Sequence, residues 1–182
     1  MVFIHGGAWT FGGAFGHNGA ALATFGDVIV IILSYRVNAL GFAFGNLALF
    51  DHVEGLKWVQ DNITSFGGDK TNVTIFGQSA GGRSIEALLS SDKANGYFHK
   101  AIAQSGSLRW KKLDRPETTN QLFDFARKYF AVQTNEELKE SLKNTNTNEI
   151  ICFYKAIQSS LGVSGFIGDD YNQFLCFILI IF

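Results

Sequence analysis

Residues 73–82 read VTIFGQSAGG, and this stretch decides the fold that the sequence predicts. Its first four residues form a short apolar run that is typical of a strand, and a helix is expected to begin at about Ala80. Residues 77–81 fit the pattern G-x-S-x-G, which between a strand and a helix forms the sharp turn that carries a nucleophilic serine. Small residues on both sides of Ser79 allow such a turn. The sequence therefore predicts Ser79 as a nucleophile, although the pattern alone also fits a glycine-rich turn with an incidental serine.

Strand-like and helix-like segments alternate along the rest of the chain. The run VIVIIL at residues 28–33 has no polar residue, which predicts a strand buried on both faces. Strands alternating with helices predict an α/β fold with a mostly parallel sheet flanked by helices. Residues 144–149 are polar and are expected to form a loop, and Asn135 is a candidate N-cap. The expected strands are Val2–Ile4, Val28–Leu33, Val73–Phe76 and Lys100–Gln104, and the expected helices are Phe50–Ile63, Ala80–Ser90, Glu117–Phe130 and Asn135–Leu142.

Composition and charge limit the possible functions. The 182 residues carry a net charge of −1 and no basic cluster, which argues against nucleic-acid binding. Two cysteines, Cys152 and Cys176, are too few for a disulfide scaffold and fit no metal-binding spacing. No cofactor or metal is therefore expected. The apolar run Phe174–Phe182 is far shorter than the ~20 residues that span a bilayer, so no membrane span is expected. No secretory signal is evident at Met1, so the protein is intracellular or its true start lies upstream.

A second glycine-rich loop, His5-Gly6-Gly7-Ala8-Trp9, follows the first expected strand. In hydrolases with a serine turn, backbone N–H groups of such a loop and of the residue after the serine stabilise the oxyanion of the tetrahedral intermediate. Glycine-rich loops also bind phosphate, but the Lys and Ser/Thr of that motif are absent here. This loop is therefore a candidate part of an oxyanion hole.

Five segments resemble the type B carboxylesterase and cholinesterase family, in the order found in that family. They read VFIHGGAW, DVIVIILSYRVNALGF, GNLALFDHVEGLKWVQDNITSFGGD, VTIFGQSAGG and FHKAIAQSGS, and together they run from Val2 to about Ser107. A weaker likeness continues to about Ile151. The resemblance implies a partial α/β-hydrolase fold whose C-terminal strands are missing. Residues 1–161 are expected to form the partial esterase domain, and residues 162–182 a divergent apolar tail.

The resemblance assigns roles to individual residues. It implies that Ser79 is the acyl-accepting nucleophile and that the N–H groups of Gly7, Ala8 and Ala80 form the oxyanion hole. Gln78, where the family commonly has Glu, and Ser105 are expected beside these groups without contacting substrate. Trp9 is expected either to line the acyl side of the site or to belong to the core. The implied partner is a small carboxylic ester, and the sequence leaves the oligomeric state and the compartment open.

No evident general base accompanies Ser79. In this fold the acid and the histidine follow the serine along the chain, and the only histidine after Ser79 is His99. His99 lies in the segment FHKAIAQSG, where the family does not place its base. The expected function is therefore a serine carboxylic ester hydrolase that is complete only in a longer form. The alternatives are an inactive fragment and a non-catalytic, cholinesterase-like adhesion or binding protein.

Overall fold

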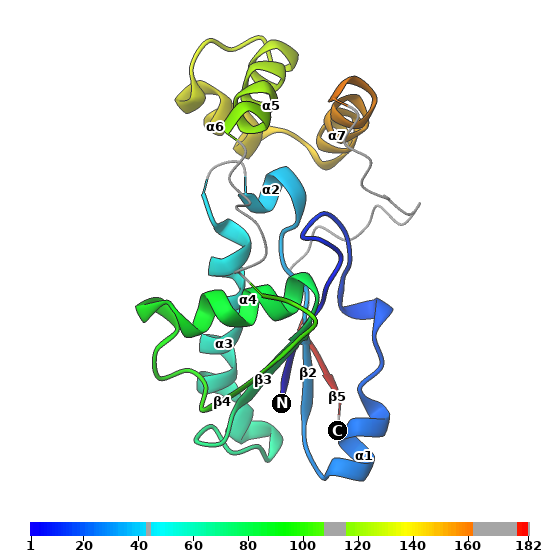
Figure 1. Cartoon of the computed structure of the whole chain (residues 1–182), viewed down its shortest axis with the longest axis vertical. Helices are drawn as coiled ribbons and strands as arrows, with labels where there is room; N and C mark the ends of the chain where they lie inside the picture. The colour runs from blue at the N-terminus through cyan, green and yellow to red at the C-terminus, as the bar shows by residue number, and fades with distance from the viewer. Residues whose placement is uncertain (43–44, 108–115, 162–177, 182) are drawn as a thin grey trace. The chain divides into compact units, whose positions relative to one another are not determined.

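The computed structural model describes residues 1–42, 45–107, 116–161 and 178–181. It contains a sheet of five strands in the order β4-β3-β1-β2-β5 (Figure 1). Strands β1, β2, β3 and β4 run parallel, whereas β5 is antiparallel to β2. The predicted α/β fold with a mostly parallel sheet is therefore confirmed. The strands are β1 (Val2–Ile4), β2 (Val30–Leu33), β3 (Thr74–Gln78), β4 (Lys100–Gln104) and β5 (Ile178–Ile181).

Seven α-helices and three short 3₁₀ helices accompany these strands in the described part of the chain. The structure divides into two compact units, residues 1–110 with 172–182, and residues 111–171. The first unit contains the sheet, and the second contains α5, α6 and α7. The helices are η1 (Ala14–Gly16), α1 (Ala20–Gly26), α2 (Asn38–Phe42), α3 (Leu47–Asn62), η2 (Ile63–Phe66), α4 (Ala80–Leu89), η3 (Asp92–Ala94), α5 (Pro116–Tyr129), α6 (Asn135–Asn144) and α7 (Thr147–Leu161).

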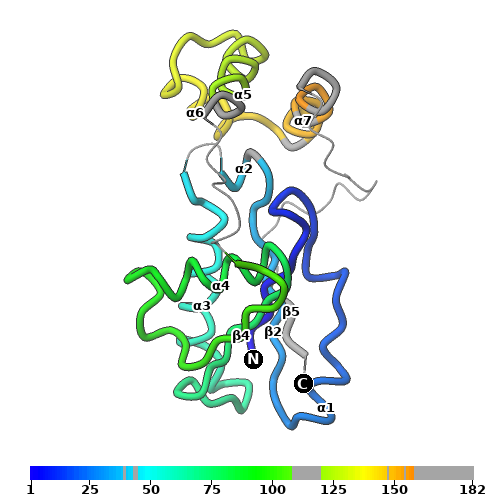
Figure 2. The backbone as a smooth tube through the Cα atoms, viewed as in Figure 1, coloured from blue at the N-terminus to red at the C-terminus, as the bar shows by residue number. Residues whose placement is uncertain are grey.

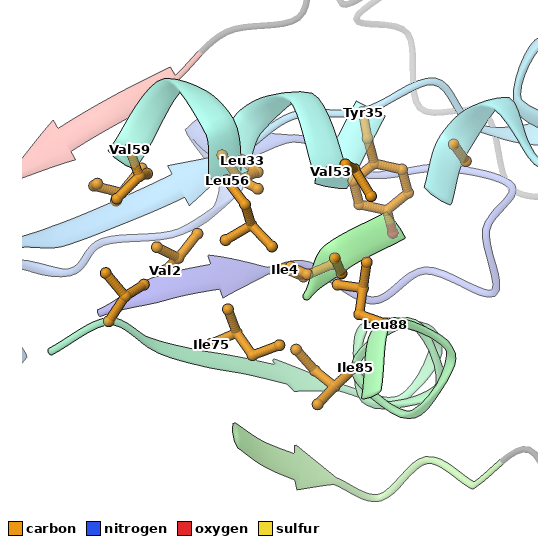
Figure 3. Close-up of a cluster of buried hydrophobic side chains, with 14 of the residues drawn as sticks. Val2, Ile4, Leu33, Tyr35, Val53, Leu56, Val59, Ile75, Ile85 and Leu88 are labelled. Carbon is orange, nitrogen blue, oxygen red and sulfur yellow. The ribbon is translucent and has the colours of Figure 1, made fainter. Parts of the chain in front are cut away.

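Alternate residues of the central strands face opposite sides of the sheet. The larger core lies where α3 and α4 cover one face, as the labelled side chains of Figure 3 show. The smaller core lies on the other face, beneath η1 and α1. Because side chains of a strand alternate with a period of two, each face receives every second residue of β2. Ile31 and Leu33 belong to the first core, and Val30 and Ile32 belong to the second.

Strand β2 confirms the predicted strand buried on both faces for Val30–Leu33, whereas residues 28 and 29 precede the strand. All four of its residues are buried, and it lies between β1 and β5 within the sheet. The partner on the far side, β5, comes from the apolar C-terminal run, for which no strand was predicted. Residues 162–177 and 182 lie outside the described residues. The predicted division of the chain at residue 162 stays a prediction.

Two local expectations for the second unit were wrong. The N-cap of α6 is Thr134 rather than Asn135, because the Thr134 side chain accepts a hydrogen bond from the backbone N–H of Glu137. The Glu137 carboxylate in turn accepts one from the backbone N–H of Thr134, which completes a capping box. Residues 144–149 form only a short break, since α7 already begins at Thr147.

Candidate active site

Ser79 lies on a one-residue turn between β3 and α4. Figure 2 labels α4, the helix that begins directly after this turn. The Ser79 backbone adopts φ 57° and ψ −118°, a conformation that L-residues with a side chain rarely adopt. Its backbone N–H donates to the carbonyl oxygen of Gln104, at the end of β4, over 2.8 Å. The strained strand-to-helix turn expected at Ser79 is therefore present. Its side chain is half-buried, whereas the neighbouring Gln78 is exposed.

The residues that flank Ser79 must be small because backbone passes close to them. A Cβ atom on Gly81 would lie 2.0 Å from the carbonyl oxygen of Ile4, and one on Gly77 would lie 2.7 Å from the carbonyl carbon of Gly81. Any side chain at these positions would push α4 away from β1. This close approach explains the G-x-S-x-G spacing in physical terms.

The glycine-rich loop after β1 lies against the Ser79 turn. A Cβ atom on Gly6 would lie 2.8 Å from the carbonyl oxygen of Gln78 and 3.3 Å from the Cβ of Ser79. Both segments follow the carboxyl ends of adjacent parallel strands, so the topology brings them to one edge of the sheet. The predicted neighbourhood of this loop and the serine is therefore found.

The loop backbone takes an unusual course. Gly7, Ala8 and Trp9 have φ values of 109°, 54° and 59°, so three successive residues occupy the left-handed region. The Gly7 carbonyl oxygen accepts hydrogen bonds from the N–H groups of Thr10 and Phe11, at 2.9 and 3.2 Å. That carbonyl is thus satisfied inside the loop. The roles of the Gly7, Ala8 and Ala80 N–H groups stay predictions.

Helix α4 brings its N-terminus to the serine. Ala80 is its first residue and is 3% exposed, and the Arg83 N–H donates to the Ser79 carbonyl oxygen over 3.0 Å. The partial positive charge at a helix N-terminus favours negative charge that develops nearby. Negative charge on the Ser79 oxygen or on a substrate oxygen beside it would therefore be stabilised.

Ser105, predicted beside the site, directly follows β4 and is exposed with φ 51°. The next residue, Gly106, packs on the serine turn, since a Cβ there would lie 2.1 Å from the Ser79 carbonyl oxygen. The segment after β4 is therefore a third wall of the site. Residues 108–115, which continue it, lie outside the described residues.

His99 lies at the wrong end of the sheet to act on Ser79. Its Nδ1 accepts from the backbone N–H of Val73 over 3.2 Å, just before β3 begins. Ser79 is six residues farther along, and strand residues rise by ~3.3 Å each, so about 20 Å separates the two. The geometry thus agrees with the expectation that His99 is not the base.

A buried aromatic cluster beneath the loop was not predicted from the sequence. His5 stacks on Tyr35 with ring centroids 4.2 Å apart, and His52 meets the tyrosine ring edge-on with centroids 4.3 Å apart. The Tyr35 hydroxyl donates to the carbonyl oxygen of His5 over 2.6 Å. The sequence offers no signal for this cluster, because its members come from three separate segments.

Burial decides the charge state of this cluster. It lowers the pKa of His5 to about 4, against a smaller opposite effect of the hydrogen bond between His5 Nδ1 and the Gly6 carbonyl. Burial likewise lowers the pKa of His52 to about 3, and it raises the pKa of Tyr35. All three rings are therefore uncharged at neutral pH. Neither ring nitrogen of His52 has a hydrogen-bond partner in the described part of the chain.

Neither a metal centre nor a membrane span is evident in the parts of the chain that the structure describes. No group of three or more His, Cys, Asp or Glu side chains there is placed to hold a metal ion. Among the same residues, no helix combines the length and the apolar character needed to cross a bilayer.

Comparison with known proteins identifies close relatives. The model of a family described as the carboxylesterase family matches residues 1–177. Human carboxylesterase 3 is 50% identical over 113 residues, which are 58% of this chain and 20% of that protein. The para-nitrobenzyl esterase of Bacillus subtilis is 44% identical over 134 residues, which are 68% of this chain and 27% of that enzyme. The chain thus spans about a fifth to a quarter of the length of these relatives.

Solved structures give the same result. The juvenile hormone esterase of Manduca sexta, solved with OTFP covalently attached, superposes with a TM-score of 0.77 at 31% identity. The match covers 91% of this chain and 33% of that esterase. A thermophilic para-nitrobenzyl esterase gives a TM-score of 0.75 at 34% identity, over 88% of this chain and 35% of that one. The fold is therefore a part of the α/β-hydrolase fold of esterases.

Proposed function

The chain belongs to the carboxylesterase family, and from that membership we propose that it carries the nucleophile side of a carboxylic ester hydrolase site. The observation that carries this proposal is the position of Ser79. It lies on a strained turn at the N-terminus of α4, and the glycine-rich loop after β1 packs directly against it. A serine held in this way can attack a carbonyl carbon with backbone N–H groups beside the developing oxyanion.

The proposed reaction has two steps. The Oγ of Ser79 attacks the carbonyl carbon of the ester, and its proton passes to a general base. The tetrahedral oxyanion accepts hydrogen bonds from the N–H groups of Gly7, Ala8 and Ala80. Collapse breaks the ester C–O bond and releases the alcohol, which takes up the proton, and water then hydrolyses the acyl-enzyme to the carboxylic acid.

The general base of this mechanism is not evident among the described residues, where no histidine is hydrogen-bonded to Ser79. His99 lies about 20 Å from Ser79 along the strands, and His52 is fully buried in the core. We therefore propose that the base and its carboxylate belong to a longer form of the protein. The covalent attachment of OTFP to the juvenile hormone esterase supports covalent chemistry for relatives of this fold.

A chimera provides the test of Ser79. Residues 1–107 of this chain replace the matching segment of the Bacillus subtilis para-nitrobenzyl esterase, which supplies the rest of the fold. We expect the chimera to hydrolyse an activated acetate ester and its Ser79→Ala variant to lose at least about 10³-fold in kcat. The Ser65→Ala chimera is the matched control, because Ser65 is exposed in η2 and belongs to no part of the candidate site. Equal rates for the Ser79→Ala and parent chimeras would exclude Ser79 as the nucleophile.

The 182-residue chain alone tests the missing base. We expect its turnover of the same ester to be no faster than that of its Ser79→Ala variant, since no histidine among the described residues is hydrogen-bonded to Ser79. An inactive fragment and an incomplete enzyme would both give this result. The chimera distinguishes them, because turnover by the chimera requires an intact nucleophile site in residues 1–107. Fast Ser79-dependent turnover by the chain alone would contradict the proposal of a missing base.

A further inference from the structure

The candidate oxyanion loop holds a conformation that it would not keep unaided. Ala8 and Trp9 both lie in the left-handed region, with φ values of 54° and 59°. For residues other than glycine this region costs about 1–2 kcal/mol each, and such backbone persists only where its surroundings enforce it. Groups that hold the loop at both ends are therefore required.

Tyr35 holds the start of the loop. It lies two residues beyond β2, its side chain is buried, and its hydroxyl donates to the His5 carbonyl oxygen over 2.6 Å. Its ring also stacks on the His5 ring at 4.2 Å and meets the His52 ring edge-on at 4.3 Å. A buried bond and a ring stack thus fix the peptide that precedes Gly6, next to the Ser79 turn.

Ser84 holds the end of the loop. The indole Nε1 of Trp9 donates to the Oγ of Ser84 over 2.9 Å, and Ser84 is completely buried in α4. Because α4 begins directly after Ser79, this bond ties the loop to the helix that carries the serine. The backbone N–H of Asn38 also donates to the Trp9 carbonyl oxygen, at 2.5 Å.

We propose that Tyr35 and Ser84 are positioning residues, which together hold the loop Gly6–Ala8 in place for oxyanion binding without contacting substrate. The expected effect on catalysis rests on the proposed function, whereas the positioning of the loop rests only on the hydrogen bonds of Tyr35 and Ser84. Tyr35 acts through the His5 carbonyl, and Ser84 acts through the Trp9 indole. Nothing in the sequence pattern around Ser79 marks either residue for this role.

Hydrogen–deuterium exchange on the 182-residue chain tests the positioning. Tyr35→Phe keeps the ring and removes only the hydroxyl, and Ser84→Ala removes only the acceptor. Thr10 and Phe11 N–H groups bond within the loop, so their exchange reports on it. We expect each variant to raise exchange of the peptide covering residues 6–11 about tenfold, the equivalent of one lost buried hydrogen bond of about 1.4 kcal/mol.

The control is Tyr97→Phe, which removes a phenol hydroxyl from a half-buried tyrosine that packs against the same core. It should leave the loop peptide unchanged. A purely structural role for Tyr35 or Ser84 would raise exchange in β2 and α4 as much as in the loop, and that result would overturn the inference. Unchanged exchange at residues 6–11 in both variants would overturn it as well.

The chimera with the Bacillus subtilis esterase supplies the catalytic readout. There, Tyr35→Phe and Ser84→Ala should each lower kcat by about 10- to 100-fold with little change in KM, because a displaced oxyanion hole acts in the transition state. If the chimera is inactive while Tyr35→Phe and Ser84→Ala raise the exchange of the peptide covering residues 6–11, the positioning role is supported and the proposed function is contradicted. If the chimera is active and neither substitution changes its kcat, the inference is overturned and the proposed function is unaffected.

Discussion

His5 and His52 are buried without charge, and both rings contact Tyr35. The pKa of each is lowered by burial, to about 4 for His5 and about 3 for His52, whereas an unfolded histidine titrates near 6.5. The unfolded chain therefore binds more protons than the folded chain once the pH falls below about 6.5. Both histidines thus make the fold sensitive to acid, and the sensitive groups lie directly beneath the candidate oxyanion loop.

We expect the free energy of unfolding to fall as the pH decreases from about 6.5 towards 4. Each of these histidines contributes a slope of up to about 1.4 kcal/mol per pH unit in this window, and His17, whose pKa burial also lowers, adds to it. His52→Gln removes one of the three titrating histidines, so its slope should be smaller than that of the parent chain. Urea unfolding at several pH values measures both slopes. A stability that is the same at pH 7 and pH 5 would contradict this prediction.

The strained turn at Ser79 was predictable because a local pattern demands small neighbours. The sequence around Ser79 shows the strand, the glycines and the helix within ten positions. The close approach of Ile4 to Gly81 explains why the position after Ala80 must be glycine. The left-handed run at Ala8 and Trp9 was not predictable, because neither residue favours φ > 0 and the conformation is held by distant partners. The same is true of Tyr35, whose hydrogen bond joins positions 30 residues apart.

At the scale of elements, the capping box is the clearest local determinant in the second unit. Thr134 and Glu137 exchange two hydrogen bonds at the start of α6, and the carboxylate of Glu137 also accepts from the N–H of Gln133. These backbone N–H groups lower the pKa of Glu137. The helix therefore begins where its first free N–H groups are satisfied by side chains.

Thr134→Ala should destabilise α6 by about 1 kcal/mol, because the N–H of Glu137 loses its acceptor. Thr134→Ser keeps the hydroxyl and should be nearly neutral. Asn135→Ala is the informative comparison, since the sequence favoured Asn135 as the N-cap and the structure shows Thr134 instead. We expect Asn135→Ala to destabilise α6 less than Thr134→Ala does. Hydrogen exchange of a peptide from residues 135–144 measures the local effect. If Asn135→Ala destabilised α6 more than Thr134→Ala, Asn135 rather than Thr134 would be the N-cap.

The elements that the sequence did not predict are α1, α2, α7 and β5. α1 and α2 have seven and five residues, too few for a helical period to stand out from the sequence. β5 pairs antiparallel with β2, which is nearly 150 positions earlier, so only the tertiary fold reveals it. Helix α3 and strand β2 were predicted because their patterns are complete within one segment, whereas α7 was missed although it has 15 residues.

At the scale of the whole molecule, the sheet of the first unit ends at β4. In the described part of the chain β4 pairs only with β3, and its other edge carries backbone groups without a neighbouring strand. Four of its five residues are exposed, among them Ile102 at 44%. An exposed strand edge with apolar side chains is a template for pairing with other chains.

We therefore expect the purified 182-residue chain to associate through β4 at micromolar concentration. Ile102→Lys should reduce this association, since a lysine on an edge strand opposes strand pairing. Phe25→Lys is the matched control: Phe25 is 91% exposed on α1, away from the edge, and the change in charge is the same. Both substitutions move the net charge from −1 to 0, which does not itself favour solubility. A reduction of association that is confined to Ile102→Lys must therefore come from the β4 edge.

Light scattering against concentration compares the three chains. Equal improvement by both substitutions would show that exposed apolar surface in general, rather than the β4 edge, drives the association.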